Sequence, residues 1–157
     1  MRSASDANER EFTRFVKETE PRLSYALAAA YGIEIGAEAT ADALEWAWEN
    51  WSKVETMKNP AGYLYRVGQS KARRHFRPVV LFPAVPQLEA PGVDPDLHLA
   101  LAHLSKNQRV AAVMVHGLGY TEREVADLLG MSRWSVRTHA ERGLSKLKSE
   151  LEVKIDV

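Results

Sequence analysis

Cysteine is absent from the 157-residue chain, which excludes disulfide bonds and thiolate metal sites. Long hydrophobic runs are absent too, since no stretch approaches the ~20 apolar residues that a membrane span needs. Residues 1–10 (MRSASDANER) lack the apolar core of a secretory signal peptide. Apolar residues make up 45% of the chain and charged residues 27%, which is normal for a soluble globular protein. We therefore expect a cytoplasmic location.

Arrangements of catalytic or metal-ligating residues are equally scarce. The histidines are scattered, and none has a second histidine or an acid at a metal-binding spacing such as HExxH. No Ser or Thr stands in a nucleophile elbow. We therefore expect no catalytic residues, no metal site and no cofactor, and the sequence gives no support to an enzyme. The five histidines are His75, His98, His103, His116 and His139.

The net charge of zero hides a strong asymmetry along the chain. Residues 1–57 hold six basic and eleven acidic side chains, whereas residues 58–77 hold six basic side chains and no acidic one. Residues 105–157 hold nine basic and seven acidic side chains. This pattern predicts an acidic surface for one partner and two basic surfaces for another, polyanionic, partner.

Apolar residues recur at helical spacing, and no strand-like alternation occurs. Pro21 predicts a break or kink near Glu20, and the two glycines of YGIEIG (31–36) predict a second interruption. Pro60 fits the favoured first position of a helix. The expected helices cover residues 6–30, 37–51, 60–77, 95–104 and 106–116, followed by a further pair.

Five of the seven prolines fall within residues 78–95, where no periodicity survives. This composition predicts a semi-extended linker at 78–94. The linker separates a domain at 6–77 from a second domain at 95–151. The sequence thus predicts an all-α fold of two small helical domains joined by a Pro-rich linker.

Residues 121–147 (TEREVADLLGMSRWSVRTHAERGLSKL) predict two short helices joined by a tight turn. Thr121 and Glu124 form a capping box at the start of the first helix. Gly130 supplies the left-handed residue that ends this helix, and Ser132 caps the next one. One side of the second helix is apolar, and the other is basic and polar, so the pattern predicts a helix-turn-helix.

The outer side of that second helix has the chemistry of a DNA recognition helix. Arg can bond guanine twice, while Ser and Thr suit phosphates or bases. The N-terminal residues of such a helix meet base edges. A helical hairpin with a solvated charged face is the alternative. The candidate DNA-binding residues are Ser132, Arg133, Trp134, Ser135, Arg137, Thr138 and Arg142.

A helical domain, a Pro-rich linker and a helix-turn-helix follow one another along the chain. In this order of motifs the chain resembles the extracytoplasmic-function (ECF) sigma factors of bacterial RNA polymerase, within the sigma-70 family. The resemblance runs from Phe12 to Leu147 and is closest over residues 104–147, which follow the order of the family's region 4. It implies that the domain at 95–151 is region 4. It also implies that the recognition helix faces the −35 promoter element.

The resemblance makes the domain at 6–77 the family's region 2. The family has Asp, Gln, Phe and Trp at intervals of three, where this chain has Asp42, Glu45, Trp48 and Trp51. The implied partner is the clamp helices of the largest polymerase subunit, and an acidic, aromatic face suits a basic coiled coil. The alternative is that the tryptophans belong to the core. The candidate polymerase-binding residues are Asp42, Glu45, Trp48, Glu49 and Trp51.

Residues 59–77 (NPAGYLYRVGQSKARRHFR) resemble the family segment that reads the −10 element and opens the duplex. Aromatic rings can stack on unpaired bases, and Arg or Lys can hold the displaced backbone. The family usually has Asn in place of Ser70 and Asp in place of Arg74, and these departures bear on promoter melting. The candidate −10 and melting residues are Tyr63, Tyr65, Arg66, Ser70, Lys71, Arg73, Arg74 and Arg77.

The function implied by the resemblance is that of a sigma factor, which binds core RNA polymerase and directs promoter-specific initiation through the −35 and −10 elements. Core polymerase and promoter DNA are the implied partners, and an anti-sigma factor is a further expectation because many relatives are held by one. A stand-alone helix-turn-helix regulator, which would favour two-fold symmetric operators, is one alternative. A degenerate sigma-like interaction module is another, and Ser70 and Arg74 keep it open.

Overall fold

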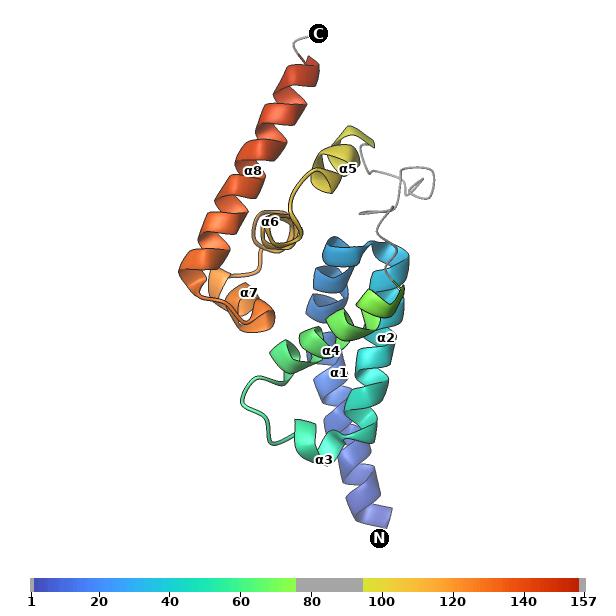
Figure 1. The fold of residues 1–157 in the computed structure, drawn as a ribbon. Coiled ribbons are helices and arrows are strands. Elements are labelled where there is room, and N and C mark those ends of the chain that lie inside the picture. Colours follow the sequence, from blue (N-terminus) through green and yellow to red (C-terminus); the bar gives the residue numbers. More distant parts are fainter. Residues whose placement is uncertain (1, 76–94, 156–157) are drawn as a thin grey trace.

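The structure is a computed structural model that describes residues 2–75 and 95–155, and within these ranges it contains helices and no strand (Figure 1). The predicted all-α fold is confirmed. The predicted linker at 78–94 and Arg77 lie outside the described residues. The elements are α1 (Arg2–Tyr31), α2 (Ile33–Glu49), α3 (Trp51–Val54), α4 (Pro60–His75), α5 (Pro95–Ala102), α6 (Lys106–Ala112), the π-helical turn η2 (Val113–Gly117), α7 (Glu122–Leu129) and α8 (Arg133–Ile155).

Of the break or kink expected near Glu20, the break is wrong, because Pro21 lies inside the continuous helix α1. A proline in a helix interior costs roughly 3 kcal/mol relative to alanine. Pro21 itself is exposed, whereas Thr19 and Leu23 are 1% and 0% exposed. The cost is offset because α1 packs on α2, α4 and α6, and this burial keeps the chain helical through the proline position.

The YGIEIG segment interrupts the chain at Gly32 alone, and α2 begins at Ile33, four residues earlier than expected. Gly32 has φ 96°, a left-handed conformation that favours glycine. Gly36 lies within α2 rather than in a loop. A Cβ atom at Gly36 would lie 2.6 Å from the Cα of Ala28, so this glycine lets α2 approach the backbone of α1.

The helix-turn-helix is built by the local signals that predict it. The Thr121 hydroxyl accepts from the Glu124 amide, and the Glu124 carboxylate accepts from the Thr121 amide, both at 3.1 Å. Gly130 ends α7 with φ 67°. The Ser132 hydroxyl then accepts from the Ser135 amide at 3.0 Å and caps α8.

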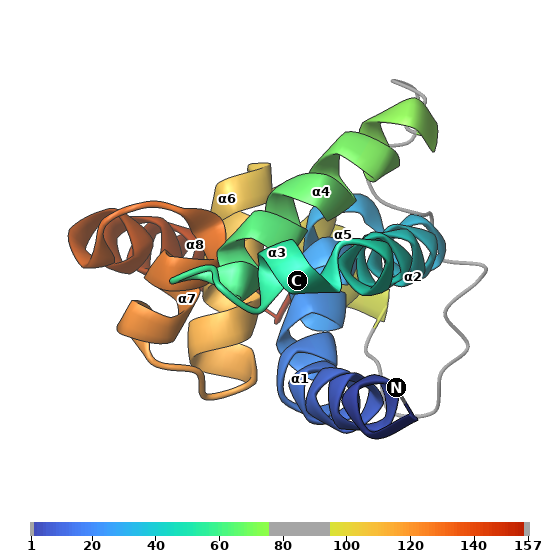
Figure 2. The ribbon, with the colours of Figure 1, turned by 90° about the horizontal axis from the view of Figure 1, so that it is seen from below.

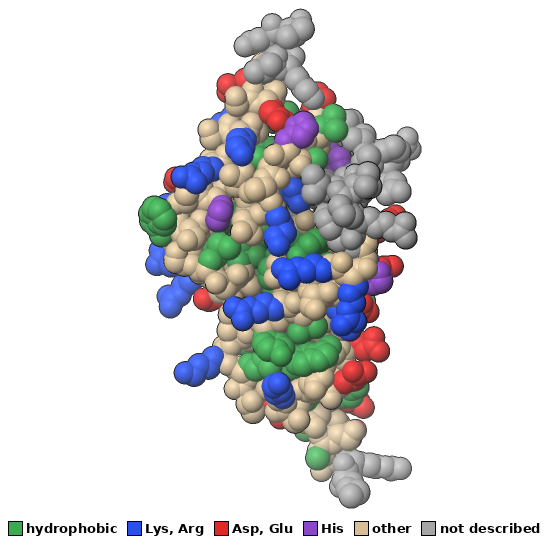
Figure 3. Space-filling model, in the orientation of Figure 1, with side chains coloured by type: hydrophobic (Ala, Val, Ile, Leu, Met, Phe, Trp, Pro, Cys, Tyr) green, Lys and Arg blue, Asp and Glu red, His purple; other side chains and the backbone are tan. Residues whose placement is uncertain are grey.

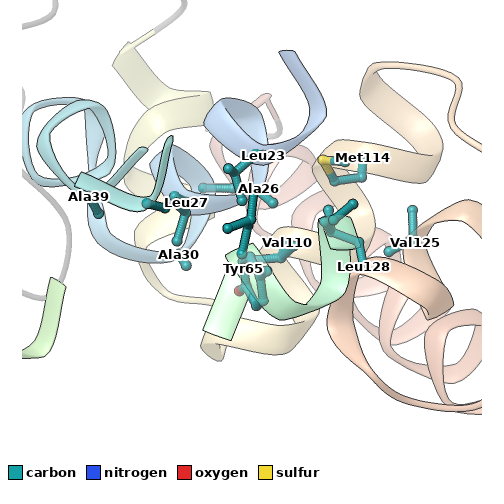
Figure 4. Packing of buried hydrophobic residues seen from close by; sticks show 14 of the residues in the cluster. Leu23, Ala26, Leu27, Ala30, Ala39, Tyr65, Val110, Met114, Val125 and Leu128 are labelled. Atoms are coloured by element: carbon teal, nitrogen blue, oxygen red, sulfur yellow. The ribbon is translucent and has the colours of Figure 1, made fainter. Parts of the chain in front are cut away.

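The two halves of the chain share one large hydrophobic cluster, and a second, smaller cluster lies within the second half. Leu23 and Leu27 of α1 belong to the same buried cluster as Val110, Met114 and Val125 (Figure 4). Seen from below, α6 and α7 lie against α1 and α4 (Figure 2). The helix-turn-helix therefore packs directly on the helices of the first half.

Candidate nucleic-acid interface

The first turns of α8 present a polar, aromatic and basic face to solvent. Trp134 is 73% exposed although it is one of the largest apolar side chains, while Val136 on the opposite side is fully buried. The Thr138 hydroxyl donates to the main-chain oxygen of Trp134 at 2.9 Å, which fixes the Thr138 side chain along the helix. Of the candidate residues on this face, Ser132, Arg133, Trp134, Arg137 and Arg142 are exposed, and Ser135 and Thr138 are half-buried.

Arg137 has a carboxylate partner that the sequence did not reveal. Its Nε donates to both carboxylate oxygens of Glu122, at 2.9 and 3.2 Å. This hydrogen bond, with the nearby negative charge, raises the pKa of Arg137 above its usual value. Because Glu122 opens α7 and Arg137 lies in α8, the pair bridges both helices of the motif.

The described part of the predicted −10 segment lies on α4, and its side chains are partly exposed to solvent and partly buried. Tyr63 is 38% exposed, whereas Tyr65 is 2% exposed and lies in the shared core. Burial, with a smaller effect from Tyr31, raises the pKa of Tyr65 above its usual range. A helix turns 100° per residue, so the two tyrosines cannot share one face. The other described candidates on α4 are exposed, namely Arg66, Ser70, Arg73 and Arg74, or half-buried, namely Lys71.

Tyr63 belongs to an aromatic pair that the sequence does not reveal. Its ring lies 5.2 Å from the ring of Trp46 in α2, and the Lys53 ammonium lies 5.9 Å from the centre of the Tyr63 ring. Trp46 is half-buried and does not belong to the series spaced three residues apart from Asp42. No spacing rule could find this pair, because its members come from helices that meet only in the folded chain.

The predicted polymerase-binding residues differ in their exposure to solvent. Glu45, Trp48 and Glu49 are exposed on α2, with Trp48 45% exposed, and Asp42 is half-buried. Trp51 begins the separate helix α3 and is 9% exposed. Its ring lies 5.3 Å from those of both Phe12 and Phe15. The residues available for a partner are therefore those on α2.

Basic and acidic side chains occupy different parts of one face of the molecule. Lys and Arg side chains gather across the middle of that face, and Asp and Glu side chains gather along the edge formed by α2 (Figure 3). This agrees with the charge asymmetry along the sequence. Over the described residues there is no cluster of three or more potential metal ligands. In the same part of the chain, no helix combines the length and apolar character of a membrane span.

The comparisons with known proteins agree with this geometry. Residues 95–147 match the family described as "Sigma-70, region 4". The fold matches a chain of the co-crystal structure of the sigma factor RpoE in complex with the anti-sigma factor NepR from Bartonella quintana. The TM-score is 0.65 at 19% identity, over 92% of this chain and 98% of that one. No curated protein matches the chain by sequence. The predicted resemblance to region 4 of the sigma-70 family is confirmed for residues 95–147, and the fold over 92% of this chain is similar to that of the solved sigma factor.

Proposed function

We propose that this chain, which carries a sigma-70 region 4 domain within a sigma-factor fold, is an ECF sigma factor that binds core RNA polymerase and directs promoter-specific initiation. The observation that carries the proposal is the helix-turn-helix of α7 and α8, which lies inside the region 4 match. Its outer face exposes Arg133, Trp134 and Arg137 to solvent. The chain itself supplies no chemistry, and its role is recruitment, recognition and capture.

Promoter recognition begins with α8 in the major groove at the −35 element. The helix N-terminus and Arg142 suit phosphates, which fix the register of the helix on the duplex. Arg133 and Arg137 suit guanine, and the indole of Trp134 can contact a thymine methyl group. Val136 keeps the helix seated on its own core while the outer face meets DNA.

Capture of the −10 element falls to α4 and its neighbours. The exposed ring of Tyr63, backed by Trp46, offers a stacking surface for an unpaired base. Arg66, Arg73 and Arg74 are exposed along the same helix and suit the backbone of a separated strand. These arginines follow Tyr63 along α4, so the proposed DNA-binding surface continues from the aromatic pair toward the end of the helix.

The described arrangement has to open before both elements are read. The −35 and −10 elements are separate sites along a duplex that rises about 3.4 Å per base pair, so the surfaces that read them have to lie apart. In the structure, the Asn59 side chain donates to the main-chain oxygen of Asp127 in α7 at 2.7 Å, so α4 and the helix-turn-helix are in contact. We propose that binding to core polymerase separates the two halves, which also exposes Tyr65.

The acidic and aromatic face of α2 is the proposed docking surface for core polymerase. Three of the predicted polymerase-binding side chains are exposed to solvent, namely Glu45, Trp48 and Glu49. Their acidic and aromatic character suits a basic coiled coil such as the clamp helices of the largest subunit. The solved structure with the similar fold holds a sigma factor with an anti-sigma factor. An anti-sigma partner is therefore part of the proposal for this chain, as is action in the cytoplasm, where polymerase works.

Transcription from sheared genomic DNA tests the proposal. Purified chain is added to bacterial core polymerase, and the 5′ ends of the RNA are sequenced. New, reproducible start sites with shared −35 and −10 motifs support a sigma factor. Core binding without new starts would favour a sigma-like interaction module. Absence of core binding, with protection of a symmetric operator by the chain alone, would favour a stand-alone regulator.

A further inference from the structure

The Glu122–Arg137 pair stands at the outer edge of the helix-turn-helix, where DNA is proposed to bind. Both hydrogen bonds from Arg137 to Glu122 use Nε, so the two Nη atoms at the tip of the guanidinium are not engaged in them. The Arg137 side chain is 54% exposed and that of Glu122 is 27% exposed. The pair thus fixes one edge of the guanidinium and leaves the tip to solvent.

The pair contributes little to the stability of the fold. An ion pair between exposed side chains contributes little to folding, because water screens it and two long side chains must be ordered. The carboxylate of Glu122 also weakens attraction to DNA phosphates, because every negative charge near the groove opposes their approach. A contact that stabilises little and opposes nonspecific DNA binding is explained if it improves selectivity.

We propose that Glu122 is a positioning residue for sequence readout. It holds Arg137 so that Nη1 and Nη2 point end-on at the O6 and N7 atoms of a guanine in the −35 element. The inference rests on the proposed function of α8. It goes beyond that function because it assigns guanine as the base that Arg137 recognises and Glu122 as the residue that orients Arg137. Ordering the side chain before binding lowers the entropy lost on contact.

Glu141 provides a matched control on the same surface. It is exposed and lies one helical turn after Arg137, and its charge also acts on Arg137. In the described part of the chain, the hydrogen bonds found for Arg137 are those to Glu122. Glu141→Ala therefore removes an equal charge without removing the contact that orients the guanidinium.

The test selects DNA from a library randomised across the −35 element, using the full chain bound to core polymerase. We expect Arg137→Ala to lose a guanine preference of roughly tenfold or more at one position. Glu122→Ala should lose most of that preference at the same position, and Glu122→Gln, which keeps a hydrogen-bond acceptor, should retain part of it. Glu141→Ala should keep the guanine preference. Glu122→Ala and Glu141→Ala, which each remove a negative charge, should both bind nonspecific DNA more tightly.

A second measurement follows the Nε–H resonance of Arg137 by NMR in the free chain. We expect slow hydrogen exchange in the wild type and in Glu141→Ala, and fast exchange in Glu122→Ala. The inference is overturned if Glu122→Ala keeps the full guanine preference, or if Arg137→Ala changes no position in the selected motif. A wild-type chain that selects no motif with core polymerase overturns the proposed function as well, whereas a motif without a Glu122 effect overturns only this inference.

Discussion

Arg109 of α6 donates from Nη2 to the main-chain oxygen of Ala30 in α1 at 2.9 Å, and it is 4% exposed. Its Nε donates to the main-chain oxygen of Ala29, and its Nη1 donates to that of Leu104 at 3.1 Å. Burial lowers the pKa of this guanidinium from its usual value, with a smaller opposing effect from Tyr65. The Arg109 guanidinium, from the second half of the chain, thus donates hydrogen bonds to main-chain oxygens at the C-terminal end of α1, in the first half.

Arg109→Ala should loosen the contact between the two halves. The substitution leaves buried carbonyls without their charged donor, which costs about 2 kcal/mol by the usual scale for such bonds. We expect a lower free energy of unfolding in urea and a larger radius of gyration in solution scattering. Arg123→Ala, at an exposed position of α7, is the matched control and should change neither quantity. An unchanged radius for both variants would show that Arg109 does not hold the halves together.

Glu45→Arg should weaken binding to core polymerase. The substitution reverses a charge at an exposed position of α2, and its predicted partner is basic. We expect slower association, with a deficit that shrinks as salt is added. Glu34→Arg makes the same change on the same helix, about 16 Å away by helical rise, and should have a smaller effect. Equal effects of the two variants would argue against a docking face centred on Glu45 and Trp48.

Trp134→Ala and Trp51→Ala should separate DNA binding from stability. Trp134 is 73% exposed, so its loss should change the free energy of unfolding by less than about 0.5 kcal/mol while weakening −35 binding. Trp51 is packed on Phe12 and Phe15, so its loss should cost roughly 3 kcal/mol or more. Thermal unfolding and promoter binding measure the two effects. A Trp134 variant that unfolds at a lower temperature than the wild type but binds the promoter normally would contradict the role of Trp134 in DNA binding.

Tyr65→Phe should reduce the sensitivity of the fold to alkaline pH. Burial raises the pKa of the Tyr65 phenol above its unfolded value, so the stability linked to its neutral form is complete below the unfolded pKa of about 10. That stability is lost as pH rises above this value. We expect wild-type stability to fall more steeply than that of Tyr65→Phe above pH ~10. Parallel curves would show that Tyr65 is not buried in solution.

Features that depend on neighbours in sequence were predictable. Thr121 and Gly130 act within a few residues, so their patterns predict the capping box and the left-handed turn that the structure contains. Pro60 likewise begins α4 as expected. These elements are fixed by local hydrogen bonds and backbone sterics, which a sequence displays directly.

Features that depend on packing between helices were not predictable. Pro21 stays helical because distant helices bury the turns around it, and Gly36 is needed for the approach of α2 to α1. The burial of Tyr65 and the Glu122–Arg137 pair depend on how separate helices are placed. The sequence also left open whether the two halves pack together, since that is decided by their shared core.

Footprinting of the complex of this chain with core polymerase, on a start site found by transcription, tests the central claim most directly. We expect directional protection of the −35 element, together with permanganate-reactive thymines at the −10 element, and both require the chain and core polymerase together. Protection of a symmetric site by the chain alone, with no reactive thymines, would contradict the account.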